Sequence, residues 1–128
     1  MHRSRLSTLC IDTNVPDLDA ATRFWSQALG RKSEPVEADS PTYRALTMRD
    51  DEPYVILQEV THSPRVHLDI EADDLEAEVK RLEALGAKRL EFVKRWWVME
   101  APSGHRFCVV NPQRGPLAAL GDRANTWK

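Results

Sequence analysis

The sequence predicts an α+β fold in which one strand–helix–strands module is written twice. Apolar residues alternate with a period of two in several short segments, while two other segments show the 3.6-residue period of amphipathic helices. Residues 10–12 (Cys-Ile-Asp) return 57 positions later as residues 67–69 (His-Leu-Asp), and the same offset relates residues 17–18 to residues 74–75. A repeat of this length indicates a duplicated supersecondary unit.

The first module is expected over about residues 6–60. Residues 6–15 contain the alternation of a strand. Asp17 is expected to cap a helix, because its carboxylate can accept the unpaired N–H groups of the first turn. Gly30 is expected to end that helix in the left-handed conformation. A polar stretch with at most a short strand follows, and further strands are predicted over residues 43–49 and 54–60.

The second module is expected over about residues 65–111. A strand over residues 66–71 precedes a helix that Asp74 caps and Gly86 ends. The strands predicted after it cover residues 87–93, 96–101 and 106–110. The tail, residues 112–128, is expected to be irregular or to form a short element packed on the domain. The length of 128 residues, with 41% hydrophobic and 30% charged residues, suits a single globular domain over residues 1–128.

Charge and composition argue against several classes of partner. The net charge is −2 and the pI is near 6.1, so nucleic acid is not an expected partner. No apolar run reaches the roughly 20 residues of a membrane helix, and the first residues lack the apolar stretch of a signal peptide. A cytoplasmic protein without a membrane partner is therefore expected. Cys10 and Cys108 lie 98 positions apart, which predicts two reduced thiols rather than a disulfide framework.

Short motifs in both modules have a distinctive order and spacing over about residues 6–111. They are Asp17-Leu18, Phe24-Trp25, Ala28-Leu29-Gly30, His67-Leu68-Asp69, Asp74-Leu75, Leu85-Gly86-Ala87, Trp97-Val98-Met99, Pro102-Ser103-Gly104 and Phe107-Cys108. In this order they resemble the glyoxalase/bleomycin-resistance superfamily, also called vicinal oxygen chelate proteins, and above all its glyoxalase-like domain branch.

The resemblance implies two βαβββ modules that form a cupped, barrel-like mixed sheet with helices outside, around a central cavity. It also implies a homodimer. Members of the superfamily include isomerases, lyases, ring-cleaving dioxygenases, epimerases and proteins that sequester drugs. Since one fold supports all of these, the resemblance alone does not choose an activity.

The resemblance also places a metal site. In metal-using members, a divalent ion is held near the start of each module's first strand and on its last strand. The corresponding residues here are Cys10, His67, Cys108 and Gln58, with Leu57 as the alternative to Gln58. Only His67 matches the usual ligands, and Cys108 stands where metal-using relatives carry glutamate. We therefore expect no cofactor; the alternative is a zinc site of Cys10, His67 and Cys108 with an open fourth position.

Strand parity adds candidate acids and aromatic residues. Asp12 and Asp69 lie two residues after Cys10 and His67, so each shares a face with its partner. Asp12, Asp69 and His67 are the weak candidates for catalysis, and the alternative for the two aspartates is pairing with Arg or Lys at the strand ends. Trp97 and Met99 are expected on one face, near the pocket. The predicted ligand pocket comprises Cys10, Gln58, His67, Trp97, Met99 and Cys108.

Two functions follow as expectations. One is a small-molecule-binding protein with a degenerate metal site and an apolar or aromatic ligand in the central cavity. The other is a lyase, isomerase or dioxygenase relative that uses an atypical metal or none.

Overall fold

The computed structural model describes residues 1–128 and divides into two compact units. One unit is Thr8–His67, and the other joins Met1–Ser7 to Leu68–Lys128. The boundary at residues 67 and 68 falls just after the point where the sequence repeat predicts the second module to begin. Each unit contains one α-helix and its own strands, so the predicted α+β class is confirmed.

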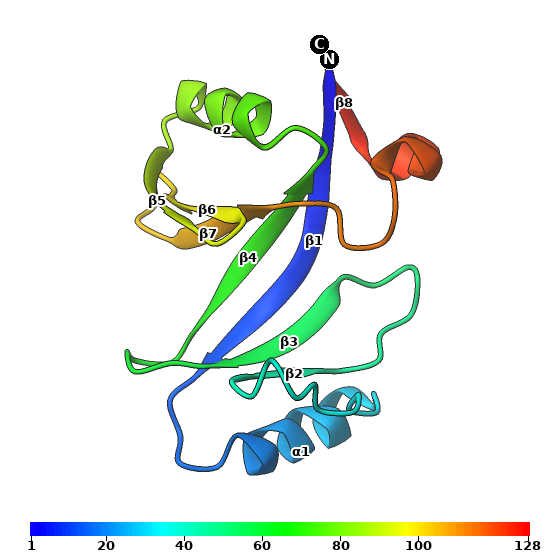
Figure 1. Cartoon of the computed structure of the whole chain (residues 1–128), viewed down its shortest axis with the longest axis vertical. Coiled ribbons are helices and arrows are strands. Elements are labelled where there is room, and N and C mark those ends of the chain that lie inside the picture. The colour runs from blue at the N-terminus through cyan, green and yellow to red at the C-terminus, as the bar shows by residue number, and fades with distance from the viewer. The chain divides into compact units, whose positions relative to one another are not determined.

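The unit Thr8–His67 contains the second half of β1 (His2–Thr13), helix α1 (Leu18–Leu29), β2 (Tyr43–Ala45) and β3 (Tyr54–Glu59). Strand β3 lies between β2 and β1; it pairs antiparallel with β2 and parallel with β1. Figure 1 shows α1 running alongside β2 and β3. The strands are therefore mixed in direction and have their helix on one side.

Helix α1 begins and ends as its sequence predicts. The Asp17 carboxylate accepts the backbone N–H of Ala20 at 3.1 Å, which satisfies one of the unpaired donors of the first turn. Gly30 takes the left-handed conformation, with φ 65° and ψ 39°, at no steric cost. The Asp74 carboxylate caps α2 (Leu75–Ala84) in the same way, through the N–H of Ala77.

The first strand after α1 is reduced to a single bridge between Ser33 and Leu46. Pro35 and Pro41 lie in this stretch, and a proline cannot donate to a strand ladder. The predicted strand at residues 43–49 is also shorter, because β2 ends at Ala45. The first module thus has fewer strands than the paired βαβββ pattern requires.

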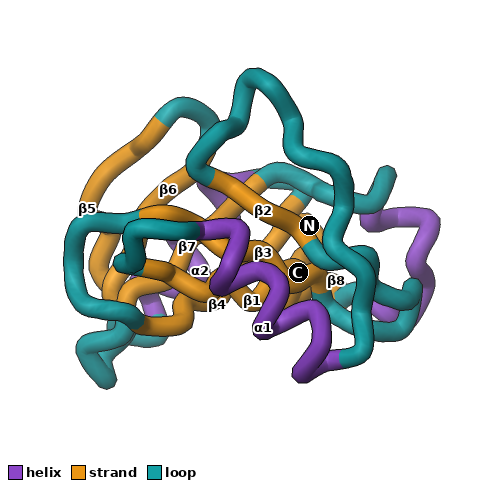
Figure 2. The backbone as a smooth tube through the Cα atoms, turned by 90° about the horizontal axis from the view of Figure 1, so that it is seen from below, coloured by secondary structure: helices purple, strands orange, loops and turns teal.

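The other unit contains a complete βαβββ module. Its elements are β4 (Arg65–Ala72), α2 (Leu75–Ala84), β5 (Lys88–Val93), β6 (Trp96–Glu100) and β7 (Arg106–Val110), where the first residues of β4 precede the unit boundary. The strand order is β4-β7-β6-β5, and β5, β6 and β7 lie side by side in both views (Figures 1 and 2). Buried residues from α2 and the strands form its core: Ala72, Val79, Leu82, Met99 and Val109.

The tail is ordered, which fits the short packed element that was one of the two alternatives expected from the sequence. A 3₁₀ helix, Leu117–Arg123, leads to β8 (Asn125–Trp127). Strand β8 pairs antiparallel with the beginning of β1, with His2 opposite Trp127. Figure 1 accordingly shows the two termini side by side. This pairing explains why β1 starts at His2 rather than at the predicted Leu6. None of the helices is long and apolar enough to span a bilayer.

Candidate functional site: a buried carboxylate among three basic groups

The site lies in the unit Thr8–His67 and is built around Asp12. Cys10 and Asp12 are two residues apart on β1, so both side chains leave the same face of the strand. Both are buried, with 1% and 3% of their surface exposed. The Cys10 Sγ atom lies 3.7 Å from Asp12 Oδ1 and 3.7 Å from Gln58 Oε1. Gln58 is opposite Asp12 in the parallel pairing of β1 and β3, which brings the predicted residues Cys10 and Gln58 together.

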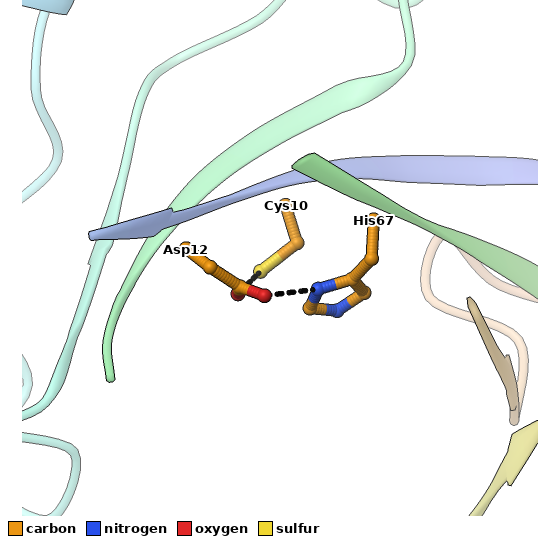
Figure 3. A group of neighbouring side chains, drawn as sticks. All are labelled: Cys10, Asp12 and His67. Carbon is orange, nitrogen blue, oxygen red and sulfur yellow. Dashed lines mark hydrogen bonds and ion pairs between the residues drawn. The ribbon is translucent and has the colours of Figure 1, made fainter. Parts of the chain in front are cut away.

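His67 completes a hydrogen-bonded pair with Asp12. Its Nδ1 atom lies 3.0 Å from Asp12 Oδ2, and its side chain is 13% exposed. Figure 3 shows Cys10 and Asp12 from β1 and His67 from β4 pointing toward one another. An ionised carboxylate can only accept, so Nδ1 is the donor in this pair and the tautomer of a neutral ring is assigned by that bond.

Two further basic groups approach the same carboxylate oxygen. His62 Nε2 and Arg65 Nε each lie 3.7 Å from Asp12 Oδ2. Their side chains are 40% and 49% exposed, and Arg65 Nη2 lies 3.3 Å from His62 Nε2. The buried carboxylate of Asp12 thus has one guanidinium and two imidazoles within 3.7 Å.

Sequence reasoning missed His62 and Arg65, which lie between the strands predicted over residues 54–60 and 66–71. The available signal was the spacing of three basic residues, His62, Arg65 and His67, around the start of the second module's first strand. On a strand, Arg65 and His67 share a face, so their joint approach to one carboxylate follows from parity.

Cys10, Asp12 and His67 also form a group capable of holding a metal ion. One ligand atom from each lies within 4.8 Å of the other two. A thiolate, a carboxylate and an imidazole are a donor set that suits zinc with an open fourth position. Asp12 was not among the ligands expected from the sequence, and Cys108, which was, lies on β7 in the other unit. Both cysteines are free, as expected.

The remaining predicted site residues belong to the other unit. Trp97 and Met99 do share a face, and that face packs against the core beneath α2, where Met99 is fully buried. Cys108 is opposite both Val98 and Asp69 in the strand register. A ligand contact for Trp97, Met99 or Cys108, and a catalytic role for Asp69, stay predictions.

A second buried carboxylate in that unit provides a contrast. Glu78 on α2 is fully buried and receives Arg81 Nε and Nη2 at 2.7 and 2.8 Å. His2 Nε2 lies 2.7 Å from Glu78 Oε1. The Arg81 guanidinium stacks on the ring of Trp127 at 3.8 Å, and Trp127 Nε1 donates to Ser4 Oγ at 2.8 Å. This network joins α2 to the paired ends of the chain.

Comparisons with known proteins give a family and a fold. Residues 8–110 match the glyoxalase-like domain family. A methylmalonyl-CoA epimerase from Mycobacterium tuberculosis superposes with a TM-score of 0.60 at 18% identity, over 91% of each chain. A glyoxalase/bleomycin resistance protein/dioxygenase superfamily member from Vibrio splendidus 12B01 has a TM-score of 0.52 at 18% identity, over 83% of this chain and 98% of that chain.

A methylmalonyl-CoA epimerase from Streptomyces coelicolor, in complex with 2-nitronate-propionyl-CoA, has a TM-score of 0.56 at 18% identity. That match covers 88% of this chain and 98% of the other. At these identities the structural matches establish the fold alone. A search of curated protein sequences finds no match.

Proposed function

Because the chain belongs to the glyoxalase-like domain family, we propose that it binds a small molecule at Asp12 and moves a proton on it without a metal ion, as an isomerase or lyase. The observation behind this proposal is the 3.0 Å pair of His67 Nδ1 and Asp12 Oδ2, in which the carboxylate is 3% exposed. Histidine is the side chain most often used to transfer protons near neutral pH.

In the proposed reaction His67 is the general base. With the Nδ1 proton donated to Asp12, the ring carries its lone pair at Nε2. Nε2 removes a proton from a carbon next to a carbonyl group, and the electrons of that C–H bond move into an enolate. The imidazolium formed is stabilised by the negative charge of Asp12, as in other histidine–carboxylate pairs. Return of the proton to a different face or atom gives an isomer; loss of a leaving group gives a lyase product.

The basic groups around Asp12 support a reaction without a metal ion. Arg65 and the two imidazoles already surround the single carboxylate of Asp12. A divalent ion bound there would lie close to the Arg65 guanidinium, and like charges repel strongly where water is scarce. The polar surroundings of Asp12 also support a polar ligand in place of the apolar or aromatic one expected from the sequence.

A zinc-dependent enzyme is the second candidate, favoured by the grouping of Cys10, Asp12 and His67. These three side chains would hold the ion, which would polarise a carbonyl oxygen of the ligand. The names of two structural neighbours denote epimerases, and this agrees with proton transfer at carbon in either form.

The test is proton exchange at carbon, followed by ¹H NMR in D₂O. Purified protein is incubated with pyruvate, 2-oxobutanoate and methylmalonyl thioesters, before and after treatment with a chelator. We expect at least one compound to lose its α-proton signal about 100-fold faster with the wild type than with His67→Gln. His105→Gln, a substitution in an exposed turn of the other unit, is the matched control and should exchange like the wild type.

Equal exchange by His67→Gln and the wild type would refute the role of His67. Exchange that stops with the chelator and returns with zinc would favour the second candidate. Binding of a compound without exchange would leave a protein that sequesters or senses its ligand.

A further inference from the structure

The first residue of β4, Arg65, is half exposed and lies at the proposed proton-transfer site. We propose that Arg65, assisted by His62, binds the carboxylate of the substrate, so that the substrate class is a small carboxylic acid with its reacting C–H next to a carbonyl. This inference rests on the proposed function and adds the group that selects the ligand.

The contact of Arg65 with its carboxylate is longer than those of the three arginines that bind a glutamate through two nitrogens. Arg31, Arg81 and Arg89 each bind a glutamate through two nitrogens at 2.7–3.0 Å. Arg65 approaches Asp12 through Nε alone, at 3.7 Å, which is beyond hydrogen-bonding distance. Its other contact is from Nη2 to His62 Nε2 at 3.3 Å. A guanidinium has five N–H donors, so this one retains most of its capacity for an anion.

The position of Arg65 suits a ligand shared with His67. Both residues are on β4, two apart, and both approach the same oxygen of Asp12. A carboxylate bound by the guanidinium would therefore place its neighbouring carbons beside the imidazole. Planar pairing of a guanidinium with a carboxylate is also directional, which orients the bound acid.

Asp12 and Arg65 differ in burial, and this difference separates their proposed roles. Asp12 is 3% exposed, whereas the Arg65 side chain is 49% exposed. The buried carboxylate attracts the guanidinium from one side, and the solvent-facing side of the guanidinium is open to an incoming anion. His62, 40% exposed and in contact with Arg65, limits the positions that the guanidinium can take.

The test uses pyruvate as the probe. Pyruvamide, which carries a neutral amide in place of the carboxylate, is the control ligand. Binding to the full-length protein is followed by ¹⁵N NMR of the arginine Nε–H signals. We expect pyruvate to shift the Arg65 signal and Arg65→Gln to weaken binding roughly 10-fold or more, as for loss of a charge-assisted hydrogen bond. Arg65→Lys, which keeps the charge but not the fork, should weaken it less. Arg23→Gln, at an exposed position of α1, is the matched control.

Equal affinity of Arg65→Gln and the wild type for pyruvate, or equal affinity of the wild type for pyruvamide and pyruvate, would overturn this proposal. Displacement of pyruvate by inorganic phosphate at similar concentration would also overturn the choice of carboxylate. The exchange assay separates the two proposals. Pyruvate bound at Arg65 without α-proton exchange would refute only the proposed function, whereas unchanged exchange and binding in Arg65→Gln would refute only the carboxylate site.

Discussion

Asp12 and Glu78 are both buried carboxylates placed between a histidine and an arginine, yet their surroundings differ. Glu78 receives three short contacts, at 2.7–2.8 Å, from Arg81 and His2. Asp12 has one short contact, from His67 at 3.0 Å, and two longer ones, from His62 and Arg65 at 3.7 Å. The basic partners of Glu78 are mostly buried, while His62 and Arg65 are largely open to solvent.

This difference indicates that Glu78 forms a structural ion pair, whereas the surroundings of Asp12 suit ligand binding and proton transfer. Both oxygens of the Glu78 carboxylate have short contacts with Arg81 or His2, so a ligand would have to break one of these contacts to bind there. The carboxylate of Asp12 forms one short hydrogen bond, with the imidazole of His67. The guanidinium of Arg65 lies nearby and keeps N–H donors that Asp12 does not bind. A perturbed buried carboxylate is thus a poor indicator of function by itself. The geometry of its partners decides between the two roles.

Of the substitutions considered, Glu78→Gln is expected to lower the free energy of unfolding the most. The substitution leaves the partly buried guanidinium of Arg81 without its counter-ion, so the free energy of unfolding should fall by about 3 kcal/mol, the lower end of the range for a buried pair. Urea denaturation at pH 7 measures it. The control is Asp19→Asn, which breaks the exposed pair with Arg44 and should change stability by less than about 1 kcal/mol. Similar losses in both variants would remove the distinction between buried and exposed pairs.

Acid should weaken the Glu78 network in part. Burial opposes ionisation of Glu78, but hydrogen bonds from Arg81, His2 and Ser4 outweigh it and hold the pKa of this carboxyl below its ordinary value of 4.5. The stability that comes from this group is fully present above that value and is lost as the pH falls through the lowered pKa. Urea midpoints from pH 7 to pH 3 should therefore fall more steeply for the wild type than for Glu78→Gln. Parallel curves would contradict this.

A smaller loss is expected for Asp12→Asn. His62 and Arg65, which approach Asp12, are half exposed and can turn to water, so the free energy of unfolding should fall by only about 1 kcal/mol. The ¹⁵N signals of the His67 ring should meanwhile move from the Nδ1–H form toward a mixture of tautomers. A stability loss equal to that of Glu78→Gln would make Asp12 a structural residue, and an unchanged ring spectrum would remove its role in orienting His67.

A loss of similar size is expected for Trp127→Phe. The phenyl ring still lies under Arg81, but the hydrogen bond from Nε1 to Ser4 Oγ is lost. A cost of roughly 0.5–1.5 kcal/mol follows, and thermal unfolding measures it. Exchange at carbon by His67 should be unaffected. Loss of that exchange would mean that the Glu78 network also serves the site.

Local chemistry made much of the fold predictable. Asp17, Asp74 and Gly30 mark helix ends through hydrogen bonds and a backbone conformation that depend on neighbouring residues alone. Parity likewise placed Cys10 and Asp12 on one face. The partners of these side chains were not predictable, because they depend on how segments far apart in the chain meet. Asp12 therefore joins Cys10 and His67 in a metal-capable group without having been expected there, and the pairing of His2 with Trp127 has no local signal at all. The homodimer and the cytoplasmic location stay predictions.

The division of β1 between the two units has a consequence for synthesis of the chain. Residues 8–13 pair with β3 and can do so once the first half of the protein has left the ribosome. Residues 2–4 pair with β8, which is made after the other seven strands. Until then, the beginning of β1 lacks that neighbour, and an exposed strand edge invites pairing with other chains. The contact of β1 with β8 therefore forms later than that of β1 with β3, and the yield of folded protein should depend on protection of this strand edge until β8 has been made.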